Sequence, residues 1–346
     1  MMGAPATDAN LLARLTRGGL PGNAAGLLGL LAALVLLFTL LLPGRFATYG
    51  TLQSMMFQLP ELGLLALAMV IPLISGGLNL AIIATTNQCA LLMAWIMSTW
   101  LTGDAGGPET VLVITCALLA GLVLCTAIGL ITGFLVATMG VHPILVTLGT
   151  KSVIDGVSIW LTRGTVVSGL PESFQWLGNG VLWGVPVPFL VLILAAVAVG
   201  LILTRTSFGI SVYMLGSNLE ATRYSGVDTK RVLIGIYTMS SILCFVAACL
   251  MLARFNSASA GYAQSYLLVT ILAAVMGGVD PYGGFGRISG LMLALVVLQV
   301  LSSGCNLLGL SQHLTLAIWG LTLIAVMGVK FLVAPWVAER IAHRPT

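Results

Sequence analysis

The sequence predicts an all-α polytopic membrane protein, with about ten transmembrane helices, glycine-broken segments between some of them, and a short helix in the cytoplasm. The first observation is composition: the 346-residue chain is 59% hydrophobic and only 7% charged, and its mean hydropathy is +1.10. Soluble domains carry about a quarter charged residues, so this chain has too little polar surface for a water-soluble globule. The second is a series of uncharged runs long enough for membrane helices of about 20 residues. The third is a charged stretch at 205–231 that interrupts these runs.

The uncharged runs divide into ten expected spans. They cover approximately residues 24–43, 53–73, 77–100, 110–138, 144–162, 186–204, 232–253, 262–279, 287–308 and 314–334. We expect a single transmembrane domain over 24–334, preceded by a cytoplasmic segment over 1–23 and followed by a cytoplasmic tail over 335–346. The N-terminal segment lacks the small-residue cleavage site of a secretory signal, so the first span is expected to be retained.

The charges between the spans predict the orientation. The outer segment at 102–110 holds two acidic residues but no Lys or Arg, whereas 205–231 holds four basic residues. Lys and Arg mark cytoplasmic loops. Both termini and 205–231 are therefore expected in the cytoplasm, although Arg163 and Arg254 fall on the outer side and do not follow the rule.

Two glycine pairs are expected to break membrane helices. Residues 74–79 (Ile-Ser-Gly-Gly-Leu-Asn) and 275–280 (Val-Met-Gly-Gly-Val-Asp) match as apolar, any, Gly, Gly, apolar, Asn or Asp. Paired glycines allow backbone conformations that other residues resist, and internal repeats with broken segments are typical of transporter folds. Coincidence is the alternative in a chain with 41 glycines. The expected turn glycines are Gly76, Gly77, Gly277 and Gly278.

Catalytic and metal-binding patterns are missing from the sequence. It contains no GxxxxGK[ST] phosphate loop, no HExxH and no GxSxG, and its three histidines lie far apart. The six cysteines lie within apolar segments without metal-ligand spacing, as expected for small buried hydrophobes. The basic residues are spread between the spans, which gives no reason to expect nucleic acid as a partner. The sequence therefore predicts neither an enzyme nor a metal site.

Ionisable residues inside the expected spans are few. Lys151 and Asp155 lie four residues apart, so they can neutralise each other on one helix. Glu61 follows Pro60 and has no partner evident from the sequence. Carboxylates within membranes often mark ion pathways, which makes Glu61 a candidate proton or cation site. The alternative is a carboxylate that a neighbouring helix satisfies.

Uncharged polar side chains are more frequent than ionisable ones at membrane depth, and residues 85–88 (Thr-Thr-Asn-Gln) form a continuous polar run in the third span. Amides both donate and accept hydrogen bonds, as a sugar hydroxyl does, so a lining of this kind suits a neutral polyol. The alternative is hydrogen bonding between helices, which is common for Asn, Gln, Ser and Thr in membranes. The candidate path residues are Asn79, Thr86, Asn87, Gln88, Asn256, Gln264 and Asn306.

The charged stretch 205–231 is expected to contain one short capped helix. Ser217 followed by Glu220 is the capping-box pattern. Glu220 also suits the positive N-terminal end of a helix, Arg223 lies nearer the negative end, and Gly226 is a usual residue just past the C-terminal end. About two turns of helix are marginal in water, so this helix needs a docking surface. Its two large apolar side chains are too few for the alternative, a helix lying on lipid.

At these residues the chain resembles the membrane permease subunits of ribose-type ABC sugar importers, from about residue 54 to 330. The segment from Arg205 through Ser217-Asn218-Leu219-Glu220 is similar to the family's cytoplasmic loop. Further matches are 146–150 (Val-Thr-Leu-Gly-Thr), 256–258 (Asn-Ser-Ala), 273–278 (Ala-Ala-Val-Met-Gly-Gly) and 283–286 (Gly-Gly-Phe-Gly). The last is near the family's Gly-Gly-Arg-Gly, which adds Gly284 and Gly286 to the expected turn glycines.

The resemblance implies a function and a set of partners. It implies the inner-membrane permease subunit of a bacterial ABC importer for a monosaccharide or related polyol, a transport subunit rather than an enzyme. The implied partners are an ATPase subunit docked on the cytoplasmic loop, a second permease subunit in a homodimer or heterodimer, and a periplasmic substrate-binding protein. ATP and Mg²⁺ would act on the ATPase subunit, and no cofactor is expected on this chain. The residues expected to couple to the ATPase are Ser217, Asn218, Glu220, Arg223 and Gly226.

One stretch departs from the family pattern. The family usually reads Ser-Gly-Gly-Ile-Asp-Leu-Ser-Val-Gly where residues 75–83 read Ser-Gly-Gly-Leu-Asn-Leu-Ala-Ile-Ile, so Asn79 stands where the family has an acid. This departure fits a different substrate or one half of a heterodimeric pair. Two other functions stay open: a branched-chain amino-acid-type ABC permease, and an ion-coupled secondary transporter using Glu61. The amide and hydroxyl lining favours a sugar over a zwitterionic amino acid.

Overall fold

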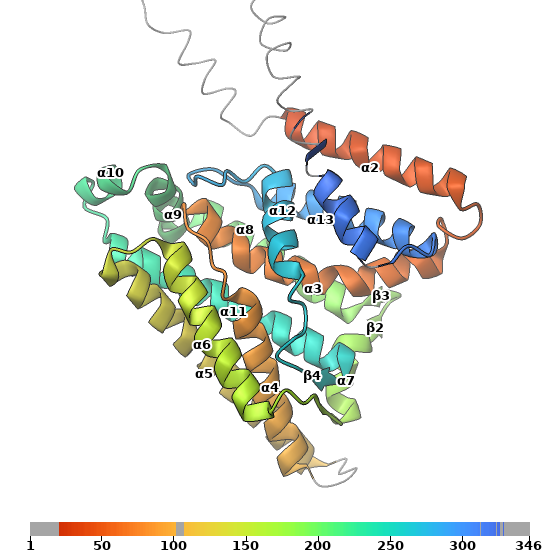
Figure 1. Ribbon diagram of the computed structural model, residues 1–346, viewed down its shortest axis with the longest axis horizontal. Helices are drawn as coiled ribbons and strands as arrows, with labels where there is room; N and C mark the ends of the chain where they lie inside the picture. The colour runs from red at the N-terminus through yellow and green to blue at the C-terminus, as the bar shows by residue number, and fades with distance from the viewer. Residues whose placement is uncertain (1–20, 102–106, 312, 323, 326–327, 329–346) are drawn as a thin grey trace, which may run out of the picture.

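The computed structural model describes residues 21–101, 107–311, 313–322, 324–325 and 328. Within these ranges, eight helices are long and apolar enough to cross a membrane. They are α2 (Pro21–Leu41), α3 (Tyr49–Ile74), α4 (Ile82–Trp100), α5 (Pro108–Met139), α6 (Pro143–Thr162), α8 (Val187–Arg205), α11 (Thr229–Phe255) and α13 (Ile288–Leu307), as Figure 1 shows. The predicted all-α polytopic membrane fold is confirmed.

Two of the expected spans are shorter than predicted. The span expected at 262–279 contains only α12 (Tyr266–Met276), which has 11 residues, because the chain before it follows an irregular path. The span expected at 77–100 begins at Ile82, because the preceding glycine turn keeps residues 76–81 out of a helix.

Other predicted segments lie at the edges of the described chain. Of the span expected at 314–334, residues 314–322 are helical and most of the remainder lies outside the described residues. The expected cytoplasmic tail at 335–346 lies outside them entirely. The expected N-terminal segment at 1–23 is described only in its last three residues, which already belong to α2.

The remaining elements gather at two opposite ends of the molecule in Figure 1. One end carries α9 (Ser207–Ser217) and α10 (Leu219–Tyr224). The other carries α7 (Glu172–Asn179) and β1 (Val167–Ser168), which pairs antiparallel with β4 (Ser257–Ala258). A second antiparallel pair joins β2 (Val181–Leu182) to β3 (Val185–Pro186). We call these the α10 end and the α7 end.

Helix α3 lies at the centre of the fold. Every residue from Leu59 to Ile74 is buried, and the helix packs against α8, α11, α12 and α13. A helix that is apolar all round is expected to be surrounded by protein. Because α3 runs from the α7 end toward the α10 end, it links the two ends of the molecule through its interior.

Helices α5 and α11 pack through two glycines that lie four residues apart. A Cβ atom at Gly129 would lie 2.7 Å from the Cα of Thr238, and one at Gly133 would lie 2.8 Å from the Cα of Ile234. Small residues at this spacing let membrane helices approach closely. The opposite face of α5 exposes mainly apolar side chains, as expected for a helix in contact with lipid.

Candidate functional site

The short helix α10 is capped by Asn218, not by Ser217. Asn218 has an extended backbone with φ −164°, and its side-chain oxygen accepts a hydrogen bond from the Ala221 amide at 2.9 Å. Ser217 is the last residue of α9, so the capping box expected from Ser217 and Glu220 is wrong by one position. Glu220 still lies in the first turn of α10, where a negative charge favours the helix.

The C-terminal end of α10 matches the prediction. Arg223 lies in its last turn, and Gly226 has φ +82°, a conformation that glycine adopts readily. The Gly226 amide donates to the Arg223 carbonyl at 3.1 Å. The predicted length of about two turns agrees with the six residues observed.

One surface of α10 is open to a partner. Tyr224 is 88% exposed and Leu219 is 48% exposed, and Glu220 and Arg223 are exposed between them. Within the described part of the chain, neither of these two charged residues forms an ion pair. Only Thr222 is buried, and its hydroxyl donates to the Asn218 carbonyl at 2.7 Å. The helix is thus held from one side and offers mixed charged and apolar groups on the other.

Four glycines join α10 to the membrane helices. We call Gly76, Gly216, Gly283 and Gly284 the glycine junction. The Gly284 amide donates to the carbonyl of Ile74, the last residue of α3, at 2.7 Å. A Cβ atom at Gly283 would lie 2.6 Å from the Gly76 nitrogen, and one at Gly216 would collide with the Ile74 carbonyl and the Gly284 amide. Three backbone segments therefore touch directly where α9 leads into α10.

Tyr213 adds a side-chain tie beside the junction. Its hydroxyl donates to the Gly286 carbonyl at 2.7 Å. Burial raises the pKa of Tyr213, so the phenol stays protonated and keeps its donor at neutral pH. Gly286 itself packs against Ile74, whose side chain would lie 2.9 Å from an added Cβ. Neither Gly216 nor Tyr213 was among the predicted site residues, although both lie in the charged stretch.

The two glycine turns share one geometry, but in a different register from the predicted match. In the first, Gly76 has φ +82° and the Gly77 amide donates to the Pro72 carbonyl; in the second, Gly278 has φ +89° and the Val279 amide donates to the Ala274 carbonyl. Both are Schellman-type helix ends. Gly76 thus corresponds to Gly278 rather than to Gly277.

The other two turn glycines serve close packing instead. Gly277 keeps a helical φ of −68°, and an added Cβ would lie 2.7 Å from the Cα of Leu291. An added Cβ at Gly77 would lie 2.9 Å from the Tyr237 hydroxyl oxygen.

Glu61 has a partner that the sequence did not reveal. Arg254, at the end of α11, places Nη1 2.8 Å from Glu61 Oε1 and also donates to the Phe57 carbonyl. Glu61 is only 4% exposed. The carboxylate is therefore satisfied by a neighbouring helix, which was the alternative to a proton or cation site. The signal available in the sequence was Arg254 itself, a basic residue on the side expected to lack them.

A polar cavity of about 370 Å³ lies beside this ion pair at the α7 end. It is open to the surface, and its lining comes from the start of α3, the end of α7 and the end of α11. The lining residues are Gly50, Gln53, Ser54, Phe57, Asn179 and Arg254.

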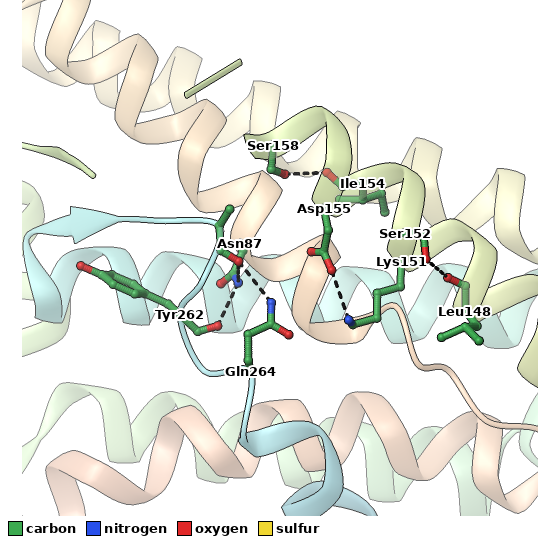
Figure 2. A network of polar contacts seen from close by, with 10 residues as sticks. Asn87, Leu148, Lys151, Ser152, Ile154, Asp155, Ser158, Tyr262 and Gln264 are labelled. Atoms are coloured by element: carbon green, nitrogen blue, oxygen red, sulfur yellow. Dashed lines mark hydrogen bonds and ion pairs between the residues drawn. The ribbon is translucent and has the colours of Figure 1, made fainter. Parts of the chain in front are cut away.

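Three predicted path residues gather around the α4 polar run. Asn87 is 3% exposed, and its Nδ2 donates to the carbonyls of Ala260 and Tyr262, both at 2.9 Å. Gln264 is exposed and donates to the same Ala260 carbonyl at 3.2 Å. Gln88 accepts a hydrogen bond from Ser158 of α6. Figure 2 shows Asn87 and Gln264 converging on the irregular chain before α12.

Helix α6 carries an ion pair next to this cluster. Lys151 Nζ lies 3.2 Å from Asp155 Oδ2, which confirms the predicted pairing of residues four apart. Their side chains are 25% and 22% exposed, and Figure 2 shows both projecting from one side of α6.

Asn79 is bonded within the protein. Its Nδ2 donates to Ser240 Oγ at 3.0 Å, and its Oδ1 accepts from the Ala81 amide at 3.1 Å. Ser240 in turn donates to the Ala68 carbonyl at 2.7 Å. Because the Ser240 hydroxyl uses its proton for the Ala68 carbonyl, it can only accept a hydrogen bond from residue 79. The neutral amide of Asn79 supplies that donor, which a carboxylate at this position could not do. The path role predicted for Asn79 stays a prediction.

The other predicted path residues do not join the cluster. Thr86 is buried and donates to the Ile82 carbonyl within its own helix at 2.8 Å. Asn256 has φ +51° and accepts a hydrogen bond from the Leu170 amide at 2.9 Å. It therefore links the chain just before β4 to the chain just after β1. Asn306 is exposed near the end of α13. The structure therefore brings Asn87 and Gln264 together at the Ala260 carbonyl, directs the neighbouring Gln88 to α6, and leaves Thr86, Asn256 and Asn306 apart.

Within the described ranges, no group of three or more His, Cys, Asp or Glu side chains could hold a metal ion. Five of the six cysteines are buried and the sixth is partly buried, all as free thiols. Their surroundings agree with the predicted role as small apolar side chains.

Comparison with known proteins relates this arrangement to transport. A family model described as the branched-chain amino acid transport system permease component matches residues 51–327. The ribose import permease protein RbsC of Bacillus subtilis is 31% identical over 297 residues, covering 85% of this chain and 88% of the relative. The autoinducer 2 import system permease protein LsrD of Yersinia pseudotuberculosis is 29% identical over 306 residues, covering 86% and 89%. No solved structure matches the chain.

Proposed function

The chain belongs to the family of branched-chain amino acid transport system permease components, and on this premise we propose that it is the membrane subunit of a bacterial ABC importer for a monosaccharide or related polyol. The relatives support a sugar-like substrate, because the two named above are a ribose permease and an autoinducer 2 permease. The uncharged polar lining around Asn87 and Gln264 also supports it. A branched-chain amino acid would favour charged partners, whereas Asn87 and Gln264 are neutral and the neighbouring Lys151 and Asp155 are already paired with each other.

The observation that carries the proposal is α10 and its attachment. The helix exposes Leu219, Glu220, Arg223 and Tyr224 to a partner, and the glycine junction joins its base to the end of α3 and to the loop before α13. A nucleotide can shift a conformational equilibrium only through different affinities for two states. An ATPase subunit that binds α10 differently in its two nucleotide states would move the end of α3 and the start of α13.

The remaining parts of the proposal follow from the same arrangement. The α10 end faces the cytoplasm with both termini, and the α7 end faces the periplasm, where a substrate-binding protein delivers its cargo. ATP and Mg²⁺ act on the separate ATPase subunit, and this chain binds no cofactor. Transport driven by an ion at Glu61 is disfavoured, because Arg254 already neutralises that carboxylate.

The experiment is Glu220→Lys, tested for copurification of the ATPase subunit and for ATP-dependent sugar uptake. The reversal places a positive charge at the positive end of α10 and in the centre of its open surface, so both readouts should fall at least tenfold. Glu172→Lys is the matched control for ATPase copurification, since it makes the same change in the first turn of a helix at the opposite, α7 end. Full assembly and uptake by the Glu220 variant would rule out docking through α10.

A second variant tests the polar cluster. Asn87→Leu keeps the branched shape and the number of heavy atoms of the side chain but removes the donor to the Ala260 and Tyr262 carbonyls, so sugar uptake should fall while ATPase binding stays normal. Unchanged uptake would make Asn87 a structural residue only.

A further inference from the structure

The cavity at the α7 end takes most of its wall from one face of α3. Gly50, Gln53, Ser54 and Phe57 follow each other at intervals of three, one and three residues, the spacing of a single helix face. The ends of α7 and α11 supply the rest of the described lining, which contains none of the predicted path residues. A volume of about 370 Å³ lies at the lower end of the range of small-molecule sites, about 300–1,000 Å³. The cavity is thus separate from the Asn87 cluster and suits a small ligand.

Arg254 brings unused hydrogen-bond donors to this cavity. A guanidinium has five N–H donors. Nη1 donates to the Glu61 carboxylate and to the Phe57 carbonyl, and among the described residues no hydrogen bond uses Nε or Nη2. The side chain is 23% exposed and lines the cavity. The ion pair therefore fixes the position of Arg254 and leaves part of its guanidinium for a ligand.

The uncharged polar groups of the lining also have hydrogen-bonding capacity to spare. Ser54 Oγ accepts from a side chain one turn further along α3 at 3.0 Å, so its own proton stays available. The Asn179 amide reaches two backbone carbonyls only at 3.4 Å, beyond the usual length of a hydrogen bond. Gln53 adds a second amide. Amides and hydroxyls both donate and accept, so this lining matches a ligand that carries several hydroxyl groups.

The charge balance of the cavity favours an uncharged ligand. Arg254 is the one charged residue of the described lining, and Glu61 offsets its charge from 2.8 Å away. An anion would therefore meet a cation that is already neutralised. A cation would need a carboxylate in the wall, but Glu61 is only 4% exposed. Phe57 gives the wall an apolar part, which suits the C–H face of a sugar ring.

From these observations we propose that this cavity is a binding site for an uncharged polyhydroxyl ligand of monosaccharide size, held by Gln53, Ser54, Asn179 and Arg254. The ligand bridges α3, α7 and α11 of one chain, next to the ion pair that joins α3 to α11. The inference rests on the proposed function in taking the α7 end to face the periplasm and the cargo to be a sugar or polyol. It adds a place where the cargo binds before it reaches the membrane interior.

The first test measures whether sugars protect the cavity wall from a thiol reagent. Ser54→Cys places a thiol in the wall, and the full-length permease in lipid nanodiscs is treated with a water-soluble maleimide. D-ribose, D-xylose, D-glucose and glycerol are added separately as probes, and at least one of the sugars should slow the labelling threefold or more. Ser173→Cys is the matched control, because Ser173 is exposed on α7 but does not line the cavity.

The outcomes of this test are distinct. Protection of position 54 but not of position 173 supports the site. Equal rates with and without every probe would overturn it, and so would equal protection of both positions. Sodium acetate, at the same concentration, tests an anion site instead. Protection by acetate and not by any sugar would show that the free donors of Arg254 serve a carboxylate.

The second test fills the cavity. Gly50 lines it, and an added Cβ would meet nothing within 4 Å, so Gly50→Leu can occupy the space without displacing the walls. ATP-dependent sugar uptake should fall at least fivefold while the ATPase subunit still copurifies. Gly29→Leu, at an equally open and exposed position on α2, is the control and should transport normally. Normal uptake by the Gly50 variant, with sugar protection unchanged in the Gly50→Leu, Ser54→Cys double variant, would contradict the assigned position of the site.

Sugar uptake by the wild type separates this inference from the proposed function. ATP-dependent uptake without protection of Ser54→Cys would remove the site and leave the function. Protection by a sugar, without uptake of any sugar, would keep the site and remove the function.

Discussion

The two ends of the molecule are held together by different chemistry. At the α10 end, the glycine junction brings three backbone segments into direct contact, and the bond between Gly284 and Ile74 joins main chain to main chain. At the α7 end, α3 and α11 are joined through side chains, because Arg254 bonds Glu61. The backbone pairing of β1 with β4 lies outside these membrane helices, and there Asn256 also bonds the Leu170 amide. Backbone contacts cannot change partner without moving the helices. Side-chain contacts can break and form again while the helices shift.

This difference agrees with the proposed function, in which an ATPase subunit displaces α10 and the membrane helices separate at the α7 end. Under the proposed function, a displacement of α10 would reach α3 through the backbone contacts of the glycine junction. The ion pair of Glu61 and Arg254, beside the cavity at the α7 end, would have to break for α3 and α11 to separate there. Variants at each end therefore test whether the contrast is real.

The largest expected effect is at the α7 end. Arg254→Gln leaves Glu61 buried without a counter-charge, and removal of one partner from a buried pair destabilises a protein by about 3 kcal/mol or more. Thermal unfolding of the purified permease measures the loss. The double variant with Glu61→Gln should recover more than half of it, and a double variant as unstable as the single one would show that the pair is not the cause.

The next effect is at the glycine junction. Gly216→Ala forces a methyl group against the Ile74 carbonyl, and overpacking of this kind costs about 1–3 kcal/mol. Unlike the Arg254 variant, it should also uncouple ATP hydrolysis from uptake, which a transport assay with measured ATP turnover detects. Gly200→Ala, at an open position on α8, is the matched control and should be neutral. Normal coupling in the Gly216 variant would mean that the junction is not rigid.

The smallest effect is at the helix cap. Asn218→Ala removes the acceptor for the Ala221 amide and should cost about 1 kcal/mol, the usual value of an N-cap. Weaker copurification of the ATPase subunit is the expected readout. Ser217→Ala should change little, since Ser217 belongs to α9. The opposite order of effects would restore the capping box that the sequence predicted.

The sequence predicted what depends on composition and on short patterns. The membrane class, most spans, the α6 ion pair and the existence of α10 all follow from residues close together in the chain. The cap of α10 was placed one residue too early because both Ser217 and Asn218 are good caps. The backbone decides between them: α9 continues through Ser217, and only Asn218 leaves the helical conformation.

Contacts between distant residues were beyond the reach of sequence patterns. Glu61 and Arg254 are separated by 193 positions, and nothing in either local sequence indicates the other. The register of the glycine turns was missed for a related reason. Both glycines of each pair suit a turn, and only the packing of Gly277 against Leu291 shows which of them must stay helical.

The short helix α12 has a consequence for how the protein enters the membrane. Eleven residues span about 16 Å, roughly half of the hydrocarbon layer, so the insertion machinery receives a segment too short to partition as a separate span. The carbonyls of Ala260 and Tyr262 just before it lie in irregular chain, and at membrane depth such carbonyls need hydrogen-bond donors from the protein. Asn87 supplies both hydrogen bonds, and α4 is synthesised before α12. The segment is thus expected to settle late in biogenesis, onto helices that have already assembled.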